Sequence, residues 1–99
     1  MSVTPPDLDK LKQQLIPVLQ AYGVTRSSIF GSFARGETTA QSDLDILVDF
    51  PFDQKSGFEF VRLADSLQKA TARRVDLVTF ASLHPYIRDQ VLAQQIPIL

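Results

Sequence analysis

The sequence contains no cysteine, no excess of basic residues and no long apolar run. Without cysteine, the chain forms no disulfide bond and offers no thiolate to zinc. Its formal net charge of −1 at pH 7 lacks the basic surface that nucleic-acid-binding proteins present to phosphates, so direct nucleic-acid binding is not expected. No segment has the length and apolar character of a membrane span or a leader peptide. We therefore expect a cytoplasmic protein without membrane attachment.

The composition is that of one ordinary globular domain. Of the 99 residues, 44% are hydrophobic and 21% are charged, which suits one core and one site. We predict an α/β (α+β) fold, a small mixed β-sheet with helices packed on it, with residues 1–99 forming a single domain. Helical spacing of apolar residues and short aliphatic runs give the expected order: a helix that starts at 4–7 and runs to 22, strand 28–30, strand 43–50, helix 56–70, strand 75–80, a last helix that begins with Ser82 and Pro85 and runs to about 94, and a short edge strand at 96–99.

Individual residues refine the first two helices. The segment TPPD at 4–7 is typical of a helix N-terminus, while Pro17 is expected to kink or split the first helix and Gly23 to end it. Ser56 and Glu59 have the spacing of a capping box at the head of the second helix. The buried stripe of that second helix is expected at Phe60, Val61, Ala64, Leu67 and Ala70.

Two aspartates stand at the start of the second predicted strand. Asp43 and Asp45 flank Leu44, and alternate side chains of a strand share a face, so their Cα atoms should lie about 6.5 Å apart on one side. The apolar run 46–48 is typical of a strand covered on both faces, which places the acids at the edge of a core. Two such anions repel unless they share a proton, pair with a cation or bind a metal. Their hard oxygen ligands suit Mg²⁺ or Mn²⁺.

Asp76 has the same setting, an acid near the start of an apolar strand. If its strand neighbours the first, about 4.8 Å away, its carboxylate can join the other two. Three acids on adjacent strands can hold two metal ions roughly 3.5–4 Å apart, as in phosphoryl and nucleotidyl transfer. The alternative is that Asp76 caps a turn or pairs with Arg73 or Arg74.

Gly31-Ser32 follows the first predicted strand and precedes a helical turn expected at 33–36. Such a turn offers backbone N–H groups and a hydroxyl to a triphosphate, although a Gly-Ser pair alone is more often an ordinary turn. Gly-Ser, ten residues and then Asp-x-Asp is a narrower pattern, because it places a phosphate site beside a metal site. Arg35 is a further nucleotide-binding candidate, and the alternative for it is a solvated side chain.

The segments GSFARGETTAQSDLDILVDF and RRVDLVTF resemble the minimal nucleotidyltransferases of the polymerase-β superfamily, small prokaryotic proteins often encoded beside a HEPN-domain toxin. The similarity runs from the first strand to the last helix. It implies that Gly31 and Ser32 bind nucleotide phosphates, and that Asp43, Asp45 and Asp76 are metal ligands, with Asp76 also the base. Family members often act as antitoxins that transfer AMP from ATP to a tyrosine hydroxyl of the toxin. The resemblance thus implies two Mg²⁺ ions, ATP as donor and a HEPN toxin as partner.

Two rival functions would use the same residues. A non-catalytic antitoxin would act by binding the toxin and keep the carboxylates as structure, although buried acids without a metal are destabilising. Nucleotidyl transfer to a small molecule such as an aminoglycoside would use the same chemistry, but no acceptor domain is evident. The sequence leaves open the donor nucleotide, the acceptor residue, the number of nucleotides added, and whether the protein assembles with itself or with a toxin.

Exposed apolar side chains would mark a partner interface. The candidates are Phe52, Phe58, Tyr86 and the tail 96–99, and for Phe58 and Tyr86 we expect completion of the small core instead. His84, the one histidine, precedes a proline at a helix start, where a solvent-facing role is predicted.

Overall fold

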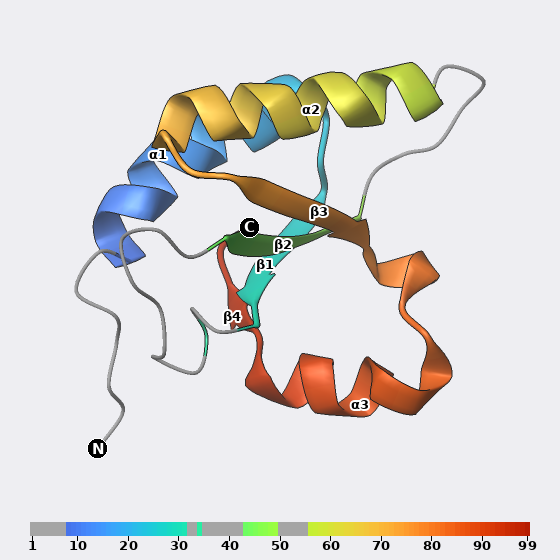
Figure 1. The fold of residues 1–99 in the computed structure, drawn as a ribbon. Coiled ribbons are helices and arrows are strands. Elements are labelled where there is room, and N and C mark those ends of the chain that lie inside the picture. The colour runs from blue at the N-terminus through green and yellow to red at the C-terminus, as the bar shows by residue number, and fades with distance from the viewer. Residues whose placement is uncertain (1–7, 32–33, 35–42, 50–55) are drawn as a thin grey trace.

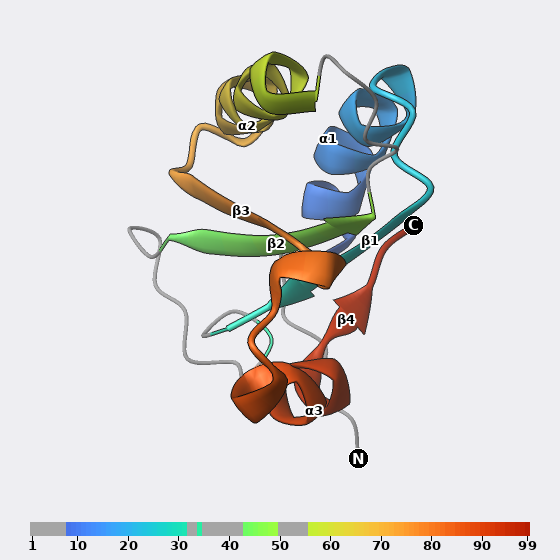
Figure 2. The same cartoon turned by 90° about the vertical axis from the view of Figure 1, so that its right-hand side faces the viewer.

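The computed structural model describes residues 8–31, 34, 43–49 and 56–99. A four-stranded sheet has two helices on one face and a third helix on the other (Figures 1 and 2). The elements are α1 Leu8–Ala21, β1 Arg26–Phe30, β2 Leu44–Asp49, α2 Ser56–Thr71, β3 Val75–Thr79, the 3₁₀ turn η1 Phe80–Ser82, α3 Pro85–Gln94 and β4 Ile96–Pro97. The predicted order of helices and strands is confirmed.

The sheet is mixed, as predicted, with the strand order β3-β2-β1-β4. β1 pairs antiparallel with β2 and with β4, while β2 pairs parallel with β3. Parallel neighbours need a long crossover, and α2 supplies it. The first two strands are therefore neighbours, and the strand that carries Asp76 lies directly beside the strand that carries Asp45.

The core lies between the sheet and the α1–α2 pair. Alternate residues of β2, namely Leu44, Ile46 and Val48, are fully buried and belong to this core. Leu15 and Leu19 of α1 and Leu63 and Leu67 of α2 complete its centre, also without solvent exposure. Because strand side chains alternate between faces, Asp45, Leu47 and Asp49 point to the opposite side of the sheet, toward α3.

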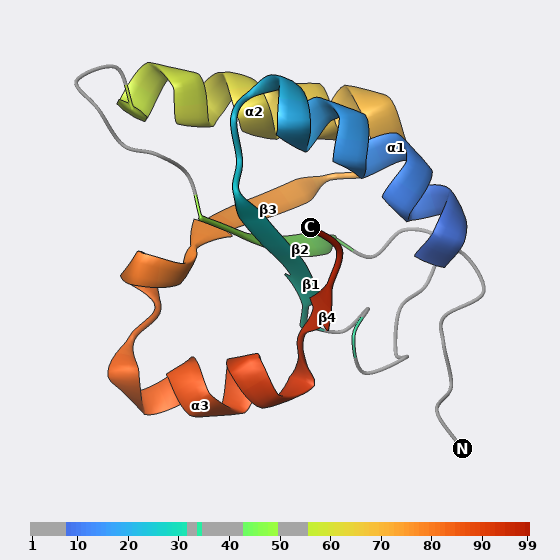
Figure 3. The same cartoon turned by 180° about the vertical axis from the view of Figure 1, so that it is seen from behind.

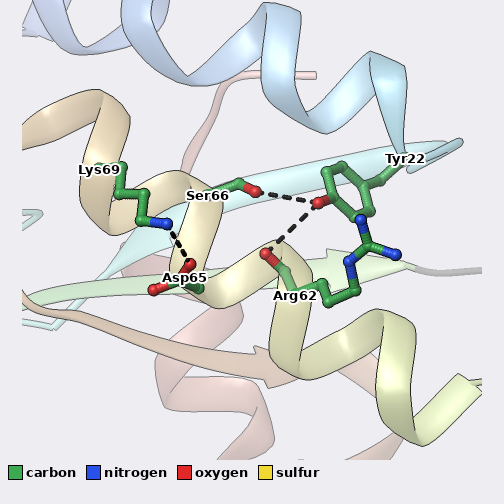
Figure 4. Close-up of polar contacts among 5 residues, drawn as sticks. All are labelled: Tyr22, Arg62, Asp65, Ser66 and Lys69. Atoms are coloured by element: carbon green, nitrogen blue, oxygen red, sulfur yellow. Dashed lines mark hydrogen bonds and ion pairs between the residues drawn. The ribbon is translucent and has the colours of Figure 1, made fainter.

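Polar contacts join α1 to α2 at the surface of this layer (Figure 4). The Tyr22 hydroxyl lies 2.9 Å from the Ser66 hydroxyl and donates to the Arg62 carbonyl oxygen at 3.5 Å. On α2 itself, Lys69 and Asp65 form an exposed i,i+4 ion pair at 2.9 Å, which adds only a few tenths of a kcal/mol, roughly 0.3–0.5. The ion pair lies within one helix, so of these contacts those of Tyr22 are the ones that join the two helices.

Pro17 does not split the first helix, contrary to one of the two expected outcomes. The helix runs without a break from Leu8 to Ala21 with Pro17 inside it. Leu15 and Leu19 flank the proline and are fully buried, so packing against the sheet outweighs one lost backbone hydrogen bond. Gly23, at φ +78°, follows the helix end as predicted. The proposed helix start at 4–7 lies outside the described residues.

The predicted buried stripe of α2 is wrong at Val61, which is 67% exposed, and it missed Leu63, which is fully buried. Successive helix positions turn by about 100°, so the buried Leu63 and Leu67 share a face and Val61 points outward. Phe58 and Tyr86 do not complete the core either, since they are 75% and 91% exposed. The capping interaction predicted for Ser56 concerns a side chain outside the described part of the structure.

The predicted edge strand is present as β4, Ile96–Pro97, and the tail 96–99 is not an exposed apolar interface. Ile98 is buried in the core, and Ile96 and Leu99 pack against it. Backbone hydrogen bonds join the segment to β1, with the Ile98 N–H donating to the Ser27 carbonyl at 2.9 Å. His84 is exposed, as predicted, and its Nδ1 accepts from the Tyr86 N–H at 3.1 Å, which caps α3. Within the part of the chain that the structure describes, no helix is long and apolar enough to span a membrane.

Candidate active site at one end of the sheet

Asp45 and Asp76 are direct register partners on the parallel strands β2 and β3. Partners in a parallel pair point to the same face, and neighbouring strands are about 4.8 Å apart. Both carboxylates therefore lie side by side on the face of the sheet opposite α1 and α2. Asp45 is half-buried and Asp76 is exposed.

Asp43 stands directly before β2 and is exposed. It lies two positions before Asp45, so continuing the strand alternation by one step places it on the same face as Asp45. Leu44 between them is fully buried, and its N–H donates to the carbonyl of Arg74 at 2.8 Å. This bond holds the start of β2 against the residue that precedes β3, which fixes Asp43 and Asp45 relative to Asp76.

Gly31 ends β1 against the Asp45 side chain. Its φ is +74°, a left-handed value that glycine adopts without a steric penalty. A Cβ at this position would overlap Oδ2 of Asp45 and would lie 3.0 Å from its Cγ. Glycine is thus required twice, once for the turn and once for the close approach of backbone to carboxylate. Ser32, Arg35 and the predicted turn at 33–36 fall among residues that the structure does not describe, apart from Ala34.

Asp76 does not form the ion pair that was its alternative role. Within the described residues, no ion pair joins it to Arg73 or Arg74, and no hydrogen bond engages its side chain. It also caps no helix among those described. An exposed carboxylate without a structural partner, held beside a second carboxylate by strand register, is available for chemistry.

The donor set suits a hard divalent cation. No group of three or more His, Cys, Asp or Glu side chains in the described ranges already has the geometry of a metal site. The observation that favours a cation is the pairing of two like charges, Asp45 and Asp76, across one strand spacing with a third carboxylate two residues away. Carboxylate oxygens are the ligands that Mg²⁺ takes in phosphate-transferring sites, so the residues fit it.

The sequence did not indicate the bond from Leu44 to Arg74 that aligns the two strands. Backbone pairing between strands separated by a whole helix depends on register, which apolar spacing alone does not give. The repeated pattern of an apolar residue, an acid and an apolar run in LDILV and VDLV was the available signal, and it does match residue for residue in the sheet.

Comparison with known proteins gives one family. Residues 11–96 match the family model of the nucleotidyltransferase domain. A Methanocaldococcus jannaschii protein named as the putative protein adenylyltransferase MJ0435 is 40% identical over 93 residues, covering 94% of this chain and 99% of the relative. The protein adenylyltransferase MntA of Thermococcus cleftensis is 40% identical over 75 residues, covering 76% of this chain and 75% of the relative.

Solved structures agree with the sequence matches. A structure described as a putative minimal nucleotidyltransferase superposes with a TM-score of 0.77 at 36% identity, covering 91% of both chains. A toxin–antitoxin crystal structure with AMP-PNP superposes with a TM-score of 0.75 at 27% identity, covering 89% of this chain and 72% of that one.

Proposed function

Because the chain belongs to the nucleotidyltransferase family and is an adenylyltransferase, we propose that it is an antitoxin that transfers AMP from ATP to a tyrosine hydroxyl of a partner toxin. The observation that carries this proposal is the register of Asp45 with Asp76, with Gly31 packed against Asp45. A phosphate-binding turn and paired carboxylates at one end of a sheet are the parts that nucleotidyl transfer needs.

Five charged or polar residues and one glycine would divide the work of binding metal and nucleotide. Asp43, Asp45 and Asp76 would hold two Mg²⁺ ions, which when bound neutralise phosphate charge in the transition state. Gly31 and Ser32 would bind the triphosphate through backbone N–H groups and the serine hydroxyl, and Arg35 would add a positive charge to them. Gly31 supports this role because its missing side chain lets its own backbone lie directly beside Asp45.

The proposed transfer forms one bond to phosphorus, breaks another and moves one proton. The acceptor hydroxyl oxygen forms a bond to the α-phosphorus, and the bond between the α-phosphorus and its bridging oxygen to the β-phosphate breaks. Asp76 accepts the hydroxyl proton on a carboxylate oxygen, and pyrophosphate leaves. Its exposure and its lack of a structural partner in the described chain support this role, since a general base must be reachable by the acceptor.

The partner in this proposal is a HEPN-type toxin in the cytoplasm. The structural neighbour with AMP-PNP is a toxin–antitoxin complex, and the sequence resembles antitoxins of this kind. Exposed apolar side chains are available for such contacts on α2 at Phe58 and Val61 and on α3 at Tyr86 and Ile87. Phe52, the other candidate, lies outside the described residues.

The test is intact mass spectrometry of the HEPN-type protein encoded beside this chain, after incubation with the chain, Mg²⁺ and each nucleoside triphosphate in turn. We expect a gain of one or more AMP units with ATP, located on a tyrosine by peptide fragmentation. The double variant Asp43→Asn, Asp45→Asn should give no gain, whereas Asp9→Asn, on the exposed surface of α1, should behave like the wild type.

A different result would replace the proposal. A tight complex without any mass gain would establish an antitoxin that acts by binding alone. If an aminoglycoside added to the incubation gained a nucleotide while the protein partner stayed unmodified, the activity would be transfer to a small molecule.

A further inference from the structure

A hollow lies on the carboxylate-bearing side of the molecule, between the sheet and α3. Its volume is about 370 Å³. Phe80, Leu83 and Leu92 form apolar walls, and Arg26, Asp49 and Arg88 bring charges to it. Views from the side and from behind show α3 on the side of the sheet opposite α1 and α2 (Figures 2 and 3). Of the proposed metal and phosphate site, the described residues Gly31, Asp43, Asp45 and Asp76 do not line the hollow.

The hollow is in line with the carboxylates along one strand. Asp45 and Asp49 are four positions apart on β2, so they share a face and are separated by about 13 Å at 3.3 Å per residue. Arg26 is the register partner of Asp49 on β1, just as Phe30 is the register partner of Asp45. The same face therefore has the catalytic acids at one end and the hollow at the other. A nucleotide whose α-phosphate lies at Asp45 would place its base near Asp49.

The charged groups around the hollow are held apart although they could pair. Arg26 and Asp49 stand opposite each other across two strands, yet no ion pair joins them in the described structure. Arg26 instead places its guanidinium 4.3 Å from the centre of the Phe80 ring. The Asp49 carboxylate is left exposed, with no described side chain bonded to it.

This combination matches the chemistry of a nucleobase. A base has flat apolar faces, which stack on aromatic rings and guanidinium planes, and a polar edge with N–H groups that donate to acceptors. Phe80 with Arg26 and the two leucines offer the apolar walls, and Asp49 offers the acceptor.

We propose that this hollow is the nucleobase subsite of the active site, with the donor nucleotide lying along β2 from Gly31 and Asp45 to Asp49. The Asp49 carboxylate accepts from the amino group of the base, which favours adenine over a base that presents a carbonyl oxygen at that position. The inference rests on the proposed nucleotidyl transfer and adds to it the residues that select the base.

The test uses titration calorimetry in the presence of Mg²⁺ to measure the binding of AMP-PNP and of inorganic triphosphate. Ala81→Trp fills the hollow from η1, where Ala81 lines it and is exposed. We expect Ala81→Trp to weaken AMP-PNP binding about tenfold or more, because base stacking is lost, and to leave triphosphate binding within about twofold. Ala93→Trp, on an exposed position of α3 that does not line the hollow, is the matched control and should change neither.

A second variant does not change the volume of the hollow. Asp49→Asn should reduce the preference for ATP over inosine triphosphate, which has a carbonyl oxygen where adenine has its amino group. If Ala81→Trp and Asp49→Asn both bind these ligands like the wild type, the base lies elsewhere and the inference is wrong. If these variants lost transfer but bound AMP-PNP like the wild type, the hollow would hold the acceptor, and the inference would again be wrong. If the wild type binds neither AMP-PNP nor triphosphate, the proposed function itself fails.

Discussion

Gly31 and Asp45 approach so closely that a single added methyl group at position 31 would occupy the place of the Asp45 carboxylate. The glycine is therefore a structural part of the site and not only a turn residue. The chain offers a natural comparison, since Gly23 has a similar positive φ of +78° but has nothing within 4 Å of a built Cβ.

Gly31→Ala should abolish transfer, whereas Gly23→Ala should not. Both substitutions carry the strain of alanine at positive φ, about 1–2 kcal/mol, and both should lower the free energy of unfolding by that order. Only Gly31→Ala also displaces Asp45, so we expect transfer to fall by at least about a hundredfold, as a misplaced catalytic group does. Urea denaturation and a transfer assay, run on both variants, measure the two effects separately. Equal activity of the two variants would contradict the role given to Gly31.

Asp76→Asn should stop chemistry without weakening the fold. The side chain is exposed and has no structural partner among the described residues, so the free energy of unfolding should change by less than about 0.5 kcal/mol. Loss of a general base typically costs about 10²–10⁴ in rate, and we expect the transfer rate to fall within that range. Single-turnover kinetics at saturating ATP gives the rate. A variant with normal turnover would exclude Asp76 as the base.

Mg²⁺ and a non-hydrolysable ATP analogue together should stabilise the protein. A ligand at a hundred times its dissociation constant raises the free energy of unfolding by about 2.7 kcal/mol. This increase in the free energy of unfolding should disappear when EDTA is added. It should also disappear in the double variant Asp43→Asn, Asp45→Asn and persist in Asp9→Asn. Thermal unfolding followed by circular dichroism makes the measurement. An equal rise in the presence of EDTA would mean that nucleotide binding does not depend on the metal.

Leu67→Ala should destabilise the protein far more than Val61→Ala. Leu67 is fully buried under the sheet while Val61 is 67% exposed on the same helix. We expect losses of about 2–5 kcal/mol for the buried leucine and of about 0.5 kcal/mol or less for the exposed valine. Urea titration of both variants measures the difference. Similar losses would show that Val61 is covered in solution, for example by a second chain.

Much of the fold and of the candidate site could be predicted from the sequence because both depend on strand alternation. Asp45 of β2 and Asp76 of β3 each follow one apolar residue and precede an apolar run. A crossover helix between two apolar strands favours a parallel pair. Asp45 and Asp76 became register partners for that reason. The roles given to Ser32 and Arg35 stay predictions, since they lie outside the described residues.

What could not be predicted depends on packing between distant segments. The start of α2 is apolar on several sides, at Phe58, Phe60, Val61 and Leu63, so its spacing alone does not decide which side meets α1. The hollow under α3 likewise depends on where Pro85–Gln94 returns across the sheet, and nothing local in that helix sets its distance from β2. Tertiary contacts therefore determine both the buried side of α2 and the position of α3.

The crossover that makes β2 and β3 parallel also separates the two carboxylates in the chain. Asp45 and Asp76 lie on strands between which the whole of α2 intervenes, so their pairing is a non-local contact. A hairpin could pair its strands early, whereas this pair needs closure of a long loop, which is slow. A nascent chain that has not yet emerged past β3 therefore has no assembled carboxylate pair, and in the proposed mechanism transfer begins only after β3 has paired with β2.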